Sequence, residues 1–213
     1  MSLHLRPEEI EAESFRIIEE EMGPHHWSPA EWPIVRRVIH TSADFEFART
    51  LYFSPDAVAR GVAALRAGRG IVTDTTMALS GIAKPRLKRF GITASCFVAD
   101  PDVARLAQEE GITRSVAAMR KALADPGNGI FVIGNAPTAL FELLRLAEEK
   151  GVCPDLVIGF PVGFVGAAES KEQLLTTAPG FGIPFITNRG RKGGSTIAAS
   201  VVNALLIMAE GAE

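Results

Sequence analysis

The stretch Ile130-Phe131-Val132-Ile133-Gly134-Asn135-Ala136-Pro137 decides the fold class of this chain. Four apolar residues in succession are typical of a strand that is buried on both faces, as the strands of parallel sheets are. The glycine and asparagine that follow end the strand, and Pro137 is suited to the first position of a helix. Strand, tight turn and helix in this order form the repeating unit of an α/β protein.

The same unit recurs from residue 70 onward, in type though not in sequence. Further β-rich runs lie at 70–73, 92–98, 156–158 and 184–187, and helical segments lie at 101–109, 113–124, 137–149 and 166–175. This alternation predicts a mainly parallel sheet of about five strands with helices on both faces, which makes three layers. The first 67 residues are predicted to be mainly helical and to wrap that sheet, with one helix start at Ser54-Pro55. Because no linker or repeat divides the chain, residues 1–213 are predicted to form a single domain.

Composition and charge restrict the class of protein. Hydrophobic residues make up 47% of the 213, which indicates a globular protein with a sizeable core. The net charge of −3 disfavours nucleic acid as a partner, so an anion site would need a local cluster of cations. Cys96 and Cys153 have no CxxC spacing and predict neither a zinc site nor a disulfide framework. The start of the chain lacks the apolar core of a signal peptide, and no apolar stretch reaches about 18 residues, so a cytoplasmic protein without a membrane partner is expected.

His40 is the first candidate for chemistry. Ser28 followed by Glu31 has the spacing of a capping box, and Pro29 suits a first helical position, so a helix of about three turns should end near His40. The C-terminal end of a helix favours a cation, which would hold a proton on the imidazole while leaving it exchangeable near neutrality. His40 is therefore a candidate proton donor. The alternative interpretation is a surface histidine that completes a helix end.

Polar residues follow the predicted strands at their carboxyl ends, where ligands bind in open α/β sheets. Thr73-Asp74, Asp100, Asn135 and Thr187-Asn188-Arg189 should share this edge of the sheet. The alternative is that an Asp or Asn in such a place caps the next helix. For Asp100, before Pro101, capping is the favoured interpretation, whereas for Asn135 both interpretations stay open.

The segment Arg189-Gly190-Arg191-Lys192-Gly193-Gly194-Ser195 predicts an anion site between a strand and a helix. Glycines allow backbone N–H groups to approach an anion, and the helix N-terminus adds partial positive charge. Arginine can bind a carboxylate or phosphate with two hydrogen bonds, at about 1.5–3 kcal/mol for each charged bond. The segment lacks the Gly-Lys-Ser/Thr of a P-loop, and a solvated basic turn is the alternative.

Arg114 and Ser14 carry the same kind of argument more weakly. Thr113 is predicted to cap the helix at 113–124, which places Arg114 in a first turn, where a cation is favourable only if an anion lies nearby. Ser14 shares one face of an amphipathic helix with Ile10 and Ile18. Its hydroxyl could contact a ligand, or it could bond back to the backbone of residue 10.

Two further segments could bind a cofactor or a second subunit. Pro161-Val162-Gly163-Phe164-Val165-Gly166 is similar to a dinucleotide fingerprint, but proline replaces the first glycine and no acid follows about 20 residues on. Nicotinamide cofactor binding is therefore rejected, and the glycines are expected to permit close packing of helix and strand. The helix at 197–208 is apolar on nearly every face, so it must be buried, either within the domain or in a subunit interface.

Several segments together resemble the precorrin-8X methylmutase (cobalt-precorrin-8 methylmutase) family over nearly the whole chain. They are Arg37-Val38-Ile39-His40, the run from Gly134 to Leu140, Gly163-Phe164-Val165-Gly166-Ala167 with Glu169-Ser170-Lys171, and Arg191-Lys192-Gly193-Gly194-Ser195. The Ser14-Phe15 helix and Thr73-Asp74 agree with the resemblance. It implies a Rossmann-like homodimer that binds its substrate near the subunit interface.

The resemblance implies an isomerase that moves a methyl group from C-11 to C-12 of a corrin precursor, giving hydrogenobyrinate or its cobalt form. His40 matches the family's catalytic acid. The implied substrate contacts are Ser14, Thr41, Thr73, Arg114, Asn135, Arg189, Arg191 and Lys192. No cofactor and no protein-bound metal are implied, and S-adenosylmethionine is not needed because the methyl group is already on the substrate. The expected partners are the tetrapyrrole, a second copy of the chain and other corrin-pathway enzymes that receive the product.

Two competing hypotheses remain at this point. A non-catalytic corrinoid carrier would hold a reactive intermediate for the next enzyme, and tight product binding would make an enzyme look similar. A nucleotide-binding α/β enzyme is disfavoured by the missing first glycine and by the missing P-loop lysine.

Overall fold

A computed structural model describes residues 6–211 of the chain; residues 1–5 and 212–213 lie outside the described part. This part forms a six-stranded sheet with the strand order β1-β6-β5-β4-β2-β3. The strands are β1 (Leu51–Phe53), β2 (Gly70–Thr73), β3 (Ala94–Ser95), β4 (Asn128–Ile133), β5 (Leu156–Gly159) and β6 (Phe185–Asn188).

Eleven α-helices and one 3₁₀ turn connect these strands in the described part of the chain. They are α1 (Pro7–Met22), α2 (Trp32–Ser42), α3 (Phe47–Thr50), α4 (Ala57–Arg66), α5 (Thr76–Gly81), α6 (Lys84–Arg89), α7 (Pro101–Glu110), α8 (Arg114–Leu123), α9 (Pro137–Lys150), α10 (Ala167–Thr177), η1 (Ala178–Phe181) and α11 (Ser195–Glu210). The five helices predicted after residue 100 are confirmed to within two residues at each end. None of the helices between residues 6 and 211 has the length and hydropathy that a bilayer span requires.

The predicted parallel α/β sheet is confirmed, with one strand more than expected. β2 to β6 pair in parallel, whereas β1 runs antiparallel to β6. The prediction missed β1 because it has three residues, too few to show an alternating pattern. The run at 92–98 was predicted as a full strand, but only Ala94–Ser95 pair with β2.

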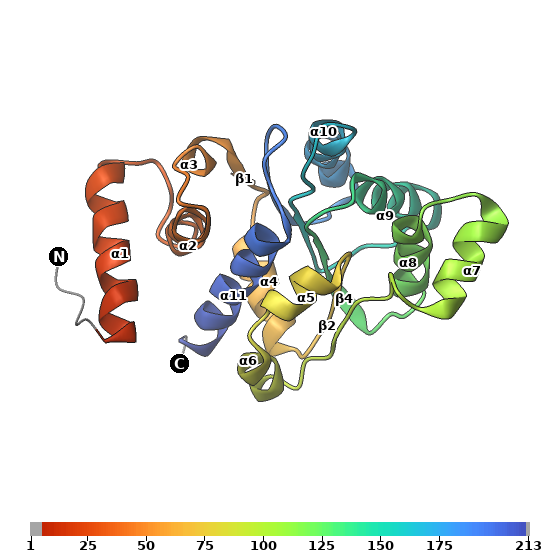
Figure 1. Ribbon diagram of the computed structural model, residues 1–213, viewed down its shortest axis with the longest axis horizontal. Coiled ribbons are helices and arrows are strands. Elements are labelled where there is room, and N and C mark those ends of the chain that lie inside the picture. Colours follow the sequence, from red (N-terminus) through yellow and green to blue (C-terminus); the bar gives the residue numbers. More distant parts are fainter. Residues whose placement is uncertain (1–5, 212–213) are drawn as a thin grey trace.

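Alternating residues of the strands face two separate cores, as in a sheet covered on both sides. Val72, Phe131, Val157 and Phe185 face the core that is completed by α8, α9 and α10. Their neighbours along the strands, including Ile71, Ile130 and Ile158, face the larger core formed with α2, α4 and α11. Figure 1 shows α1 and α2 as a further layer at one end of the molecule, on the outer side of α11. Of the first 67 residues, α1 and α2 therefore lie outside α11, whereas β1 joins the sheet and α4 packs directly against β4 and β5.

The helix α11 is buried within the single chain. It packs against α2, α4 and α5, and its polar exception, Asn203, donates to the carbonyl of Gly81 (2.8 Å) and accepts from the amide of Ala83 (2.9 Å). Its first turn lies so close to β4 that a Cβ on Gly134 would be 2.7 Å from the Cα of Ser195. Of the two predicted alternatives, burial inside the domain is therefore confirmed, and this helix does not need a subunit interface to be covered.

One predicted helix start is wrong. The helix after Ser54-Pro55 begins at Ala57, and the residue before it, Asp56, has a left-handed backbone. Ser54 instead extends the pairing of β1 with β6, because its hydroxyl accepts from the amide of Phe185 (2.8 Å) and its own amide donates to the Phe185 carbonyl (2.9 Å).

Candidate functional site

Asp74, at the carboxyl end of β2, organises the edge of the sheet where ligands were predicted. Its carboxylate is 1% exposed and accepts hydrogen bonds from the amides of Gly134 (2.8 Å), Asn135 (2.8 Å) and Ala136 (2.7 Å). Burial raises the pKa of the carboxyl group, while the three amides favour its ionised form. Asp74, which follows β2, thus fixes the loop that leads from the neighbouring strand β4 into α9. It acts as a cap for a helix that follows another strand.

The other residues predicted near this edge differ in accessibility. Thr73 is buried, and its hydroxyl donates to the carbonyl of Thr75 (2.9 Å). Asn135 is exposed, and so is Arg114 in the first turn of α8. The predicted cap at Thr113 is confirmed, because its hydroxyl accepts from the amide of Val116 (3.2 Å) and also contacts the hydroxyl of Thr138 (3.1 Å). That contact places Arg114 beside the first turn of α9.

Asp100 is a second position where the predicted cap differs from the structure. Asp100 occupies the N-cap position of α7, but its side chain makes no capping hydrogen bond. The carboxylate accepts from Lys121 Nζ (2.8 Å) on α8 instead. The capping interpretation is therefore wrong for this side chain, since the ion pair competes for the same oxygens.

The segment 189–194, here called the glycine loop, folds closely onto the end of β5. A Cβ on Gly193 would lie 2.4 Å from the carbonyl oxygen of Phe160, so only glycine fits there. The Gly194 amide donates to the same carbonyl (2.9 Å), and the Gly163 amide donates to the Arg191 carbonyl (3.2 Å). The Arg191 guanidinium lies over the exposed ring of Phe164, 5.6 Å from its centre. The glycine loop and the loop at 161–166 therefore form one surface.

The predicted close packing is absent at Gly163, whereas a Cβ on Gly166 would lie 3.3 Å from Pro137 at the start of α9. Gly163 has φ +134° with no neighbouring atom within 4 Å of a Cβ, and Gly166 has φ +78°. These glycines allow left-handed backbone at a turn, so the expectation of close helix–strand packing is wrong for Gly163.

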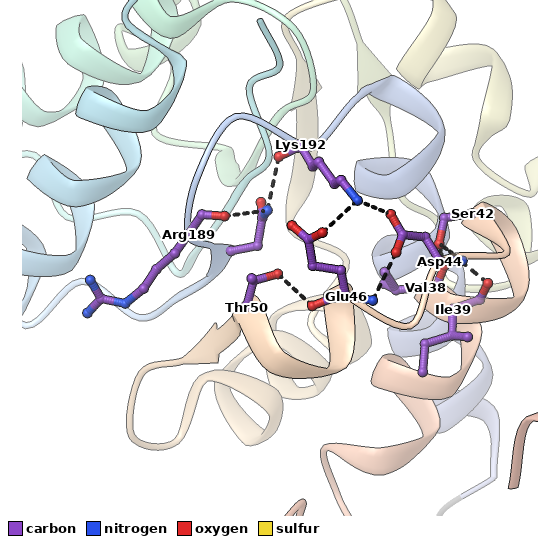
Figure 2. A network of polar contacts seen from close by, with 9 residues as sticks. Val38, Ile39, Ser42, Asp44, Glu46, Thr50, Arg189 and Lys192 are labelled. Atoms are coloured by element: carbon purple, nitrogen blue, oxygen red, sulfur yellow. Dashed lines mark hydrogen bonds and ion pairs between the residues drawn. The ribbon is translucent and has the colours of Figure 1, made fainter. Parts of the chain in front are cut away.

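Two of the three cations of the glycine loop are paired with carboxylates of the chain. Arg189 Nη1 contacts both carboxylate oxygens of Glu172 at 2.9 Å. Lys192 Nζ lies 2.5 Å from Asp44 and 2.9 Å from Glu46, and Figure 2 shows it reaching across to the segment that follows α2. These pairings raise the pKa of Lys192 and lower that of Asp44. The segment predicted to bind anions therefore binds anionic side chains within the protein.

His40 lies in the last turn of α2, as predicted. The helix ends at Ser42, and Ala43 follows with a left-handed backbone and an amide that donates to Ile39 (2.7 Å). The predicted capping box also forms, because the Ser28 hydroxyl accepts from the Glu31 amide (3.3 Å) and the Ser28 amide donates to the Glu31 carboxylate (3.0 Å). The regular helix begins later than predicted, at Trp32, because residues 29–31 form a turn.

The imidazole of His40 is exposed and lines a pocket of about 350 Å³ between α1 and α2, here called the α1–α2 pocket. Its ring meets the edge of Phe15 at 5.2 Å. Ser14 also lines this pocket, although its hydroxyl donates to the Ile10 carbonyl (2.8 Å), so the predicted back-bonding is confirmed. Thr41, next to His40, is exposed and donates to the Arg37 carbonyl (2.8 Å).

The α1–α2 pocket and the glycine loop are neighbours without sharing a lining. The pocket is lined by Ser14, Ile17, Ile18, Glu21, Ile39, His40, Ala43 and Phe45. Lys192 is bound by Asp44 and Glu46, which stand on either side of the pocket residue Phe45 in the sequence. The two candidate regions are therefore connected through four consecutive residues, 43–46.

Sequence reasoning missed the burial of Lys171. Its side chain is 0% exposed, and Nζ donates to the Lys192 carbonyl (2.6 Å) and to Asn188 Oδ1 (3.1 Å). Burial lowers the pKa of this amine to about 8. Glu169, two residues earlier in the same helix, is exposed, so the two side chains lie on different sides of α10. A signal existed, because Lys171 lies four residues after Ala167 and three before Leu174, on the apolar face of the helix.

An open α/β sheet with a cationic loop and a histidine pocket beside it has the architecture of an enzyme for a small anionic molecule. Residues 9–208 match the family described as precorrin-8X methylmutase. The chain is 48% identical to the cobalt-precorrin-8 methylmutase of Priestia megaterium over 208 residues, which cover 98% of this chain and 91% of that protein. It is 50% identical over 207 residues to the protein of the same name from Salmonella typhimurium, with 94% and 95% covered.

Solved structures agree with the sequence comparison. The precorrin-8X methylmutase of Thermus thermophilus superposes with a TM-score of 0.85 at 42% identity, covering 94% of this chain and 95% of that one. The chain belongs to the precorrin-8X methylmutase family, and it is an isomerase of cobalamin biosynthesis.

Proposed function

We propose that this protein moves a methyl group from C-11 to C-12 of precorrin-8X or cobalt-precorrin-8, giving hydrogenobyrinate or cobyrinate. Relatives named for the metal-free and for the cobalt-containing substrate both align over most of the chain. The methyl group migrates within one molecule, so the reaction needs no nucleophile from the protein. It needs a site that holds the macrocycle and a group that makes the migration easier.

His40 is the proposed acid, and its place in the α1–α2 pocket carries this proposal. The exposed imidazole stands at the C-terminal end of α2 and lines the pocket, where it can meet a bound macrocycle directly. Proton transfer from His40 to the ring system would draw electrons away from the migration terminus. General acid catalysis of this kind contributes about 10²–10⁴-fold to a rate. Ser14, which lines the same pocket, and Thr41, the next residue in the sequence, are proposed to contact the substrate or to orient the ring.

The carboxylate arms of the tetrapyrrole are proposed to bind Arg189, Arg191, Lys192 and Arg114. Arg189 and Lys192 would exchange Glu172, Asp44 and Glu46 for carboxylates of the substrate. The exchange costs little, because exposed ion pairs stabilise a protein by only about 0–1 kcal/mol. Asn135 is exposed at the same edge and can donate directly, whereas the buried Thr73 is proposed to act through the backbone that it holds.

A homodimer with the substrate near the subunit interface is part of the proposal. The α1–α2 pocket, at about 350 Å³, is too small for a ring of four pyrrole units and is open on one side. A second copy would cover the part of the macrocycle that extends beyond it. The product would then pass to another corrin-pathway enzyme, in the cytoplasm.

The substitution His40→Ala tests the acid. We expect turnover to fall by about 10²–10⁴-fold, with corrinoid binding and the thermal midpoint unchanged, since the side chain is exposed. His26→Ala is the matched control, because His26 is also exposed but does not line the pocket. Unchanged turnover in His40→Ala would remove His40 from the mechanism.

Two measurements with the unaltered protein test the rest of the proposal. The visible spectrum of substrate in excess over protein separates an enzyme from a carrier, because a carrier stops at one equivalent. Metal-free and cobalt-containing substrates, compared side by side, show which form this protein converts faster.

A further inference from the structure

The buried amine of Lys171 holds the glycine loop from below. Its Nζ donates to the Lys192 carbonyl (2.6 Å) and to Asn188 Oδ1 (3.1 Å), while Asn188 Nδ2 donates to the Lys192 carbonyl (3.0 Å) and to the Arg189 carbonyl (3.1 Å). Lys171 and Asn188 are both 0% exposed. Two buried side chains therefore bind the backbone at both ends of the segment that carries Arg189, Arg191 and Lys192.

An ammonium group without exposed surface requires a reason. Burying it is unfavourable unless hydrogen bonds replace those to water, and an apolar residue at this position on α10 would avoid the cost. The acceptors that Lys171 has are a neutral amide and a backbone carbonyl. What the lysine provides is a fixed position for the Lys192 carbonyl, and hence for the direction of the Lys192 side chain.

The contact extends from Lys192 to the region of His40. The Lys192 backbone is bound from one side by Lys171, and its Nζ is bound from the other side by Asp44 and Glu46 (Figure 2). Asp44 also accepts from the Glu46 amide (2.9 Å) and donates its own amide to Ser42 Oγ (3.2 Å) in the last turn of α2. The backbone position that Lys171 fixes therefore determines where the cations of the glycine loop stand relative to the α1–α2 pocket.

We propose that Lys171 is a positioning residue for the methyl shift, which sets the affinity for the carboxylated substrate by fixing the glycine loop without touching the substrate. The inference rests on the proposed function. It assigns a purpose to a buried amine that the acid chemistry of His40 does not use.

The test compares Lys171→Met with Lys150→Met, using metal-free precorrin-8X as substrate. Methionine keeps the length of the side chain and removes its donors, and Lys150 is an exposed lysine at the last turn of α9. We expect Lys171→Met to raise KM by about tenfold or more, as the loss of a charged hydrogen bond does, with kcat changed by less than about threefold. Lys150→Met should leave both constants unchanged, and Lys171→Arg should restore part of the affinity.

A second variant and a second measurement keep the test decisive. Asn188→Ala removes the other buried group that binds the glycine loop, and it should produce the same rise in KM. It serves as the test if Lys171→Met does not fold. Hydrogen–deuterium exchange of the amides at 189–194 should accelerate in either variant without substrate present. A folded variant with unchanged KM would overturn the proposal, whatever its exchange rates. If the unaltered protein converts neither precorrin-8X nor cobalt-precorrin-8, the proposed function itself is refuted.

Discussion

Compared with the α1–α2 pocket, the loop between β4 and α9 is a closed structure. Asp74 is buried there and is bound by three amides, whereas His40 is exposed and its imidazole faces the pocket. Both regions place a charged or ionisable group at a helix end, Asp74 before α9 and His40 in the last turn of α2. A charged group at a helix end therefore contributes to stability where it is buried, and it can meet a substrate where it is exposed.

Removing the enclosed carboxylate is expected to have the largest effect. Asp74→Ala should lower the free energy of unfolding by about 3–4 kcal/mol, because three amides lose their acceptor and each unsatisfied buried group costs about 1–3 kcal/mol. Urea unfolding measures this change. Asp74→Asn retains one acceptor oxygen, so its free energy of unfolding should lie between those of the unaltered protein and Asp74→Ala. A loss below about 1 kcal/mol in Asp74→Ala would mean that water replaces the carboxylate, and the contrast with the pocket would disappear.

The pH dependence of stability should reveal the burial of a second group, Lys171. Burial lowers the pKa of Lys171 to about 8 from the usual 10.5, so the unfolded chain binds more protons than the folded chain between these values. The contribution of Lys171 to stability should therefore increase as the pH rises through this window, on the order of 2 kcal/mol between pH 7.5 and 10. Urea unfolding of the unaltered protein and of Lys171→Met at both pH values isolates it. A constant difference between the two proteins would show that the amine titrates alike in both states.

Arg191 is exposed, like His40, so its replacement should alter the kinetics and not the stability. Its guanidinium contacts the exposed ring of Phe164 and is available to a carboxylate arm. Arg191→Ala should raise KM about tenfold and leave the thermal midpoint unchanged. Arg105→Ala, at an exposed arginine of α7, is the control. If Arg191→Ala lowers the thermal midpoint and leaves KM unchanged, Arg191 has a structural role like that of Asp74.

Ser14 should show the smallest effect. Its hydroxyl already donates to the Ile10 carbonyl within α1, so Ser14→Ala removes a bond that the helix does not need. We expect kcat/KM to change by less than about threefold. Steady-state kinetics with either substrate form would reveal a larger change, which would place the hydroxyl in direct contact with the macrocycle.

Much of the fold could be predicted because its signals are local. The apolar runs that became β2, β4, β5 and β6, and the cap at Thr113, are each decided by residues within one element. The helix end at His40 was predictable for the same reason. β1 was not, because three residues carry no periodicity and this strand exists only through its pairing with β6.

The residues of the candidate site could be proposed from the sequence, but the contacts that they make could not. The cluster of cations at 189–192 was evident, whereas its pairing with Asp44 and Glu46 joins residues up to 148 positions apart. The same holds for Asp74, which binds amides about 60 residues later, and for Lys171, whose burial depends on the path of the glycine loop. Such contacts are set by the order of the strands, which no local pattern in the sequence determines.

The short strand β1 has a consequence for the behaviour of the chain in concentrated solution. It occupies the hydrogen-bonding groups along one side of β6, whose four residues are all buried. Unprotected sheet edges recruit other chains and lead to aggregates. Three residues between α3 and α4 thereby prevent other chains from pairing with the edge of β6, which leaves association to other surfaces, such as that of the proposed homodimer.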